Sequence, residues 1–151
     1  MRPEPPAIGR PLKFIGRVHR GFLRLADQQL REQGLAMGHL PVLLALKDGQ
    51  PRSQAELARL AQVEQPSMAQ LLNRMERDGL VERVPDPADK RSRLILLTAA
   101  CRARMPKSRE VMEALSAEAL VGFSEAEVVQ LAKLVGRLAD NIDRMLAEQL
   151  G

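Results

Sequence analysis

The sequence predicts a mainly α protein with one small β-hairpin. Hydrophobic residues make up 45% of the 151 residues but aromatic residues only 2%, so Leu, Val, Ile, Ala and Met must form the core, and this composition favours helices. Most of the chain carries apolar residues at three- and four-residue steps, which is typical of helices. Two short segments, 80–84 and 93–98, instead alternate in the manner of strands. The length corresponds to about one domain.

The N-terminal part is predicted to be a proline-rich arm followed by two helices. Residues 1–11 contain four of the ten prolines and are expected to be flexible. A helix is predicted from residue 12 to about residue 33, with Gly34 as its stop. Its apolar period consists of Ile15, Val18, Phe22 and Leu25, and Gln29 continues it. A short second helix is predicted over about 39–47.

The middle of the chain predicts two helices joined by a short turn. Ser53 and Glu56 have the spacing of a capping box, which opens the first of these helices. Pro66 suits the first turn of the second helix, where its missing N–H is not needed. This helix is expected to run to about Asp78, with Gly79 as its stop, and the hairpin follows at once.

Two long helices are predicted after the hairpin. Thr98 can cap a helix from residue 99 to about residue 120, and we expect Pro106 to cause either a bend or an irregularity in an early turn. The segment 124–127 is a second capping box, and the final helix covers about 125–149 with apolar residues at regular helical spacing.

The helix over 66–78 has an unusual outer face. Its inner side is apolar, whereas its outer side carries short hydrogen-bonding side chains and two arginines rather than Lys–Glu pairs. Compact donors and acceptors and bidentate arginine are the groups that read base edges in the major groove of DNA. An ordinary solvated helix face is the alternative. The candidate DNA-binding residues on this helix are Ser67, Gln70, Asn73, Arg74 and Arg77.

A charged loop, "DPADKR" at 86–91, joins the two predicted strands. Lys90, Arg91 and Arg93 are expected at the tip of the hairpin, where arginine can enter the narrow minor groove. We expect Asp86 and Asp89 to orient the neighbouring arginines by charge-assisted hydrogen bonds. The combination predicts a winged helix-turn-helix that binds double-stranded DNA. Further candidate DNA-binding residues lie at the predicted helix starts, namely Ser53, Gln54 and Gln65.

The segments described above resemble those of a known family. The segment "SQAELARLAQVEQPSMAQLLNRMERDGLVER", followed by "DPADKR" and "LLT", resembles the winged helix-turn-helix core of the MarR (multiple antibiotic resistance regulator) family. The resemblance extends over 12–149. It implies a DNA-binding domain over 35–98 and a homodimer whose terminal helices, 12–34 and 99–149, form the dimerisation region.

The resemblance also implies how such a protein acts. Members of the family bind a palindromic or pseudo-palindromic operator, usually as repressors. The position of Arg91 matches the minor-groove arginine of the family, with Asp89 as its partner, and the groove-facing positions carried over are Ser67, Gln70 and Arg74. Members often release DNA when a small aromatic or amphiphilic ligand binds or when a cysteine is oxidised. The sequence names no ligand-binding residue here.

Cysteine and histidine are too scarce to indicate redox or metal chemistry. Cys101 is the single cysteine, which excludes an intramolecular disulfide and indicates a reducing compartment. We expect Cys101 to be a small buried apolar residue rather than a sensor. His19 and His39 are predicted to be surface or capping residues, so no metal site and no cofactor are expected.

With no signal peptide and no apolar run long enough to span a membrane, the prediction is a cytoplasmic protein.

Charge distribution and motifs together favour DNA binding over two other classes of function, an enzyme and a protein–protein adaptor. Residues 74–109 hold ten Lys/Arg against five Asp/Glu, and residues 110–151 hold three against eight. This asymmetry favours a polyanion partner for the first segment and places the acidic segment away from it. No Ser-His-Asp set, glycine-rich phosphate loop or carboxylate pair indicates an enzyme. A helical protein–protein adaptor without DNA binding remains the alternative, and it predicts no salt-dependent affinity for duplex DNA.

Overall fold

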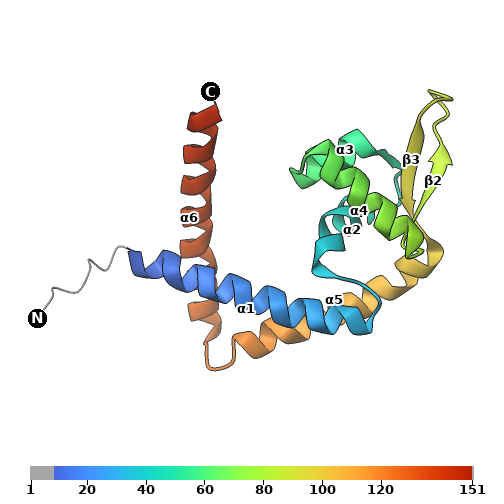
Figure 1. The fold of residues 1–151 in the computed structure, drawn as a ribbon. Helices are drawn as coiled ribbons and strands as arrows, with labels where there is room; N and C mark the ends of the chain where they lie inside the picture. The colour runs from blue at the N-terminus through green and yellow to red at the C-terminus, as the bar shows by residue number, and fades with distance from the viewer. Residues whose placement is uncertain (1–8, 151) are drawn as a thin grey trace, which may run out of the picture. The chain divides into compact units, whose positions relative to one another are not determined.

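The computed structural model describes residues 9–150, which form six α-helices and a small antiparallel sheet (Figure 1). The chain divides into two compact units, 1–112 and 113–151, and each is considered by itself. Most of the proline-rich arm predicted over 1–11, namely residues 1–8, lies outside the described residues.

The first unit opens with helix α1 (Arg10–Glu32), which begins two residues earlier than predicted. Pro11 lies in its first turn, where no backbone N–H is required, so this proline does not keep the segment out of the helix. Just after the helix, Gly34 adopts a left-handed conformation with a φ of +70°, which glycine reaches at little cost. The predicted stop is therefore confirmed.

Helices follow in the predicted order. A 3-10 turn, η2 (Met37–His39), leads into α2 (Leu40–Leu46), and α3 (Gln54–Ala61) and α4 (Gln65–Arg77) come next. The capping box of α3 is confirmed. The Ser53 Oγ accepts from the Glu56 N–H at 3.2 Å, and a Glu56 carboxylate oxygen accepts from the Ser53 N–H at 2.8 Å. These bonds hold the pKa of Glu56 below its usual value, the backbone N–H of Ser53 being the main cause.

The hairpin consists of β2 (Val81–Pro85) and β3 (Arg93–Leu97), paired antiparallel with Val81 opposite Leu97. A third strand, β1 (Arg52–Ser53), pairs with the other edge of β3, which gives the order β1-β3-β2. The sequence did not predict β1, because two residues are too few to show the alternation of apolar and polar side chains that is typical of a strand. Its pairing places the start of α3 beside the hairpin.

One continuous core joins these elements. Helices α2, α3 and α4 and the strands turn their apolar residues toward one another, whereas α1 contributes only near its C-terminal end. The largest fully buried side chains are those of Leu46, Leu57, Met68, Leu72, Met75, Leu80, Ile95 and Leu97. Leu and Met form most of this core, as the composition predicted.

Helix α5 (Ala99–Ala119) starts at the predicted cap: the Thr98 Oγ1 accepts from the Cys101 N–H at 3.1 Å. The same hydroxyl donates to the Gly79 carbonyl at 2.6 Å. Pro106 lies inside the helix, which continues through it. The Cys101 side chain is fully buried, as expected for a small apolar residue, and burial raises the pKa of its thiol.

The second unit contains the end of α5 and helix α6 (Glu125–Leu150). The predicted capping box is confirmed here too, since the Ser124 Oγ accepts from the Glu127 N–H and Glu127 accepts from the Ser124 N–H. Many apolar side chains of α6 are exposed on the chain, including Leu131, Leu134, Val135, Ile142 and Met145. Within residues 9–150, no helix combines the length and apolarity needed to cross a membrane.

The core position of Leu72 predicts a large loss of stability on truncation. The Leu72 side chain is fully buried, so Leu72→Ala should lower the free energy of unfolding by about 2–5 kcal/mol through lost burial and a residual cavity. Leu60→Ala is the matched control, because Leu60 is 46% exposed and should lose much less. Urea denaturation at one protein concentration measures both; similar losses in the two variants would contradict the assignment of the core.

Candidate nucleic-acid interface

Helix α4 has the two-sided character that the sequence predicted. Met68, Leu72 and Met75 are fully buried against the core. The burial of this face directs the other side of the helix outward. All five predicted residues of the outer face are exposed, namely Ser67, Gln70, Asn73, Arg74 and Arg77.

The start of α4 is tied to the start of α3. The side-chain amide of Gln54 donates to the Gln65 Oε1 at 3.2 Å, so two of the candidate residues meet each other directly. Ser53, a third candidate, uses its hydroxyl oxygen as the cap of α3 and is half-buried. The structure therefore brings Ser53, Gln54 and Gln65 together at the junction of the two helices.

The other end of α4 is tied to the hairpin by Arg83. This guanidinium donates to the Glu76 carboxylate at 3.0 Å and to the Asn73 Oδ1 at 2.8 Å. Asn73 thus already uses its acceptor oxygen to hold α4 against β2. Arg83 was not among the predicted residues, although the sequence carries a signal for it. Residue 83 shares a strand face with buried Val81, so an arginine there requires a polar partner.

The loop of the hairpin corrects one prediction. We expected Asp86 and Asp89 to hold arginine side chains, but their carboxylates accept backbone N–H groups instead. Asp86 accepts from Ala88 at 2.9 Å, and Asp89 accepts from the backbone N–H of Arg91 at 2.9 Å rather than from its guanidinium. Short aspartate side chains favour such Asx turns because the backbone N–H two residues on is nearer than any side chain.

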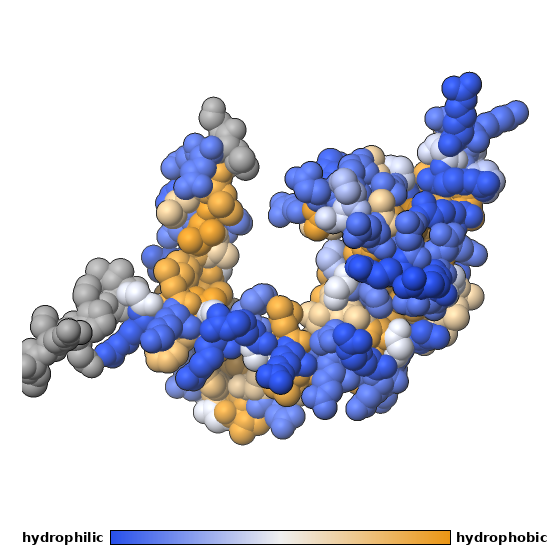
Figure 2. Space-filling model, in the orientation of Figure 1, coloured by the Kyte–Doolittle hydropathy of each residue, from blue (hydrophilic) through white to orange (hydrophobic). Residues whose placement is uncertain are grey.

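Because Asp86 and Asp89 bind the backbone, the cationic side chains of the loop remain exposed. Lys90 and Arg91 lie in the turn itself, whereas Arg93 is already the first residue of β3, opposite Pro85. All three side chains are exposed, and within the described part of the chain none of them forms an ion pair. The end of the hairpin is uniformly hydrophilic in Figure 2. The loop is thus a cationic projection whose backbone is fixed by its own aspartates.

A polar groove lies beside α4, where α1 ends and η2 begins. Asp27 accepts from the Arg31 Nε at 2.8 Å and from the Met37 N–H at 3.0 Å. The Met37 bond, followed by the Arg31 bond, lowers the pKa of Asp27. Arg74 and Asp78 of α4 also line this groove, so Arg74 lies on the side of the outer face nearest to α1.

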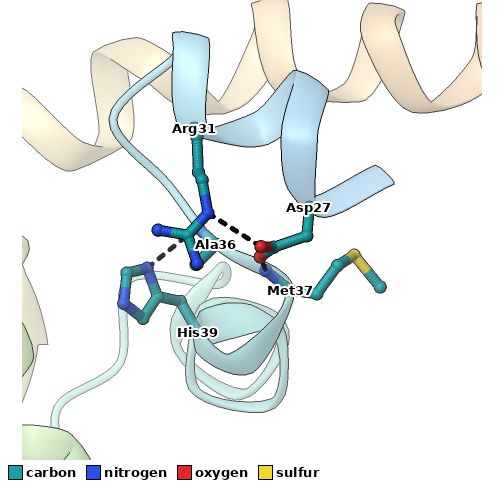
Figure 3. A network of polar contacts seen from close by, with 5 residues as sticks. All are labelled: Asp27, Arg31, Ala36, Met37 and His39. Carbon is teal, nitrogen blue, oxygen red and sulfur yellow. Dashed lines mark hydrogen bonds and ion pairs between the residues drawn. The ribbon is translucent and has the colours of Figure 1, made fainter. Parts of the chain in front are cut away.

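His39 caps the segment between α1 and α2. Its Nδ1 accepts from the Ala36 N–H at 3.1 Å, which confirms the prediction of a capping role and requires an unprotonated Nδ1 (Figure 3). Burial lowers the pKa of His39, and the nearby Arg74 acts in the same direction, whereas Asp78 acts against it. His19, by contrast, is exposed on α1.

Comparison with known proteins assigns the fold. Residues 33–92 match the family model described as MarR family. The chain is also similar to a mutant of MarR from E. coli complexed with operator DNA, at 25% identity over 89% of this chain and 99% of that one, with a TM-score of 0.75. Residues 33–92 thus match the MarR family, and the described part of the chain shares the fold of that solved MarR structure.

Other solved structures agree with the MarR family. The transcriptional regulator SlyA is 25% identical over 88% of this chain and 94% of its own, with a TM-score of 0.73. The MarR family transcription regulator SP03579 has a higher TM-score, 0.83, at 20% identity over 93% of both chains, and supports the fold. The predicted winged helix-turn-helix with long terminal helices is therefore confirmed.

The candidate interface carries no cluster that indicates a metal. Among residues 9–150, no group of three or more His, Cys, Asp or Glu side chains is placed to hold a metal ion. The absence of a metal or cofactor in the working protein remains a prediction.

Arg83 should stabilise the winged helix-turn-helix through its two bonds to α4. Its side chain is 27% exposed, and Arg83→Ala should lower the free energy of unfolding by about 1–2 kcal/mol, because two charge-assisted hydrogen bonds are lost. Arg77→Ala is the control: Arg77 is 73% exposed and lies 3.9 Å from Asp78, so it should change stability by less than about 0.5 kcal/mol. Equal effects in urea denaturation would contradict a clamping role for Arg83.

Acid should destabilise the chain through His39. Its pKa is lowered in the folded state, so the unfolded state binds the proton more readily. The stabilisation is complete above the ordinary value of 6.5 and is lost as the pH falls through the lowered pKa. His39→Asn keeps an acceptor for the Ala36 N–H without titrating, so between about pH 7.5 and about pH 5 it should lose less unfolding free energy than the wild type.

His19→Asn is the control for this measurement and should respond to acid as the wild type does. Identical pH dependence in the wild type and in both variants would show that the His39 cap contributes nothing to acid sensitivity.

Proposed function

We propose that this protein is a transcriptional regulator that binds double-stranded DNA as a homodimer, on a pseudo-palindromic operator. One observation carries the proposal: the outward face of α4 presents short polar side chains and arginines, and the helix is fixed at one end to α3 and at the other to the hairpin. A rigid helix with such a face suits the major groove. Ser67, Gln70, Arg74 and Arg77 are proposed to face the bases and phosphates.

The hairpin would serve as the wing. Lys90, Arg91 and Arg93 are exposed and unpaired by carboxylates within the described residues. A narrow minor groove attracts arginine because its negative potential is enhanced. We therefore assign Arg91 to the minor groove. Asp89 supports it indirectly, by fixing the backbone of the turn through the Arg91 N–H.

The exposed apolar faces of the terminal helices support the homodimer. Large apolar side chains of α1 and α6 are exposed on a single chain, among them Leu12, Val18, Leu25, Leu134 and Ile142. A second copy can cover both faces, and a two-fold dimer presents two α4 helices and two wings. This symmetry matches an operator with two related half-sites.

Further parts of the proposal rest on similarity to the MarR family alone. We propose that the protein acts as a repressor in the cytoplasm and that a small aromatic or amphiphilic effector releases it from DNA. No enzymatic activity is proposed, in keeping with the generally non-enzymatic character of MarR-family regulators.

Selection from random duplexes tests the proposal against the protein adaptor. We expect the purified protein to enrich one pseudo-palindromic sequence from random duplexes of about 40 base pairs. If about four Lys/Arg per subunit contact phosphates, log K should fall against log salt with a slope of roughly −7. An adaptor would select no sequence and would show no such slope, because its contacts would be apolar.

Arg91 offers a residue-level test. Arg91→Ala should weaken binding to the selected duplex by on the order of 1–3 kcal/mol, about fivefold to 150-fold, because a minor-groove contact is lost. Lys133→Ala, which removes one cation from α6, should leave the affinity almost unchanged. A gel-shift titration in which Arg91→Ala binds as the wild type does would reject the minor-groove role.

A further inference from the structure

Helix α1 carries a regular row of cations that the proposed operator contact does not use. The row, which we call the basic stripe, has members three or four positions apart, so all fall on one side of a helix with 3.6 residues per turn. It spans about 21 Å at 1.5 Å per residue. All members are exposed, and Figure 2 shows strongly hydrophilic side chains projecting from α1. They are Arg10, Lys13, Arg17, Arg20 and Arg24.

From Lys13 to Arg24, no carboxylate among the described residues compensates the charge of the stripe. Residues 9–26 contain no Asp or Glu. Within the described residues, Lys13, Arg20 and Arg24 have no carboxylate partner, and Arg17 lies over the Phe14 ring at 5.5 Å. Like charges three and four residues apart disfavour a helix, whereas solvated helices commonly mix both signs. The stripe is therefore unfavourable for α1 on its own and indicates an anionic partner.

Two glycines flank the stripe in the middle of the helix, where glycine is unfavourable compared with alanine. A Cβ at Gly21 would meet nothing within 4 Å, and one at Gly16 would meet only the end of the Arg20 side chain, at 3.3 Å. Packing within the chain therefore does not require either glycine. Without side chains at these positions, an extended surface can approach the helix backbone beside the cations.

We propose that the basic stripe binds the phosphate backbone of a second duplex segment, distinct from the one that α4 and the hairpin bind. The inference rests on the proposed function, in that α4 and the wing occupy the first duplex. Four of the five cations are arginines, whose planar guanidinium groups pair with phosphate in bidentate fashion. One dimer would then connect two stretches of DNA, one by sequence and the other by charge alone.

Duplex DNA fits the stripe better than an anionic membrane. A helix that lies in a membrane surface inserts its apolar side. In α1 the apolar side is buried at Ala26 and Leu30, and the dimer proposed above would cover the rest of it. A dimer that covers the apolar side leaves no apolar surface of α1 for insertion into a membrane, and a row of cations without apolar contact suits a phosphate backbone.

A capture experiment with the full-length dimer tests the proposal. The selected operator duplex is fixed to beads and saturated with protein, and a fluorescent duplex of unrelated sequence is added at about 50 mM salt. The wild type should retain the second duplex and release it as the salt rises. The triple variant Arg17→Gln, Arg20→Gln, Arg24→Gln should retain at least about tenfold less while binding the operator within about twofold of the wild type.

Two further variants keep the test specific. The triple variant Lys133→Gln, Arg137→Gln, Arg144→Gln removes three cations from α6 and should retain the second duplex as the wild type does. Arg17→Lys, Arg20→Lys, Arg24→Lys keeps the charge and should retain most of the capture. Equal losses in the α1 and α6 glutamine variants would overturn the proposal, because the effect would then be one of net charge.

The remaining outcomes separate this proposal from the proposed function. A wild type that saturates the operator but retains no second duplex overturns the basic-stripe proposal and leaves operator binding intact. A wild type that binds no selected duplex overturns the proposed function itself. If the wild type instead binds phosphatidylserine vesicles and the α1 glutamine variant does not, while no duplex is retained, the stripe is a membrane surface and the proposal is wrong.

Discussion

The burial of one face of α4 is the constraint on which the candidate interface depends. Met68, Leu72 and Met75 fill the centre of the core, so the helix cannot rotate without exposing them. That packing directs the polar residues of the other side outward, and among them Asn73 also accepts a hydrogen bond from Arg83. The contacts to α3 and to Arg83 then fix the two ends. Apolar packing thus sets the direction of the polar face, and hydrogen bonds set its position.

Local signals in the sequence were sufficient for most of the fold. The capping boxes at Ser53 and Ser124, the hydroxyl cap of Thr98 and the stop at Gly34 each act within a few residues, so a pattern of side chains specifies them. Strand β1 was missed because its pairing with β3 joins residues more than forty positions apart. Nothing in its two residues indicates that partner.

The outer face of α4 was also predictable, since helical periodicity alone separates it from the core. The partners of polar side chains were not. Asp89 binds a backbone N–H where a guanidinium was expected, and Asn73 binds Arg83, which lies ten residues away on a strand. Periodicity indicates which way a side chain points, whereas the hydrogen-bond partner of that side chain depends on the distances between elements. The loop aspartates consequently rigidify the wing without neutralising it.

The hydroxyl of Thr98 links the far end of α4 to the first turn of α5. It donates to the Gly79 carbonyl and accepts from the Cys101 N–H, so one oxygen atom serves both elements. Neither bond tolerates much displacement, because hydrogen bonds weaken steeply with distance and angle. One hydroxyl thus couples the position of the segment that ends α4 to the first turn of α5, so a substitution that removes it, such as Thr98→Val, would release both elements at once.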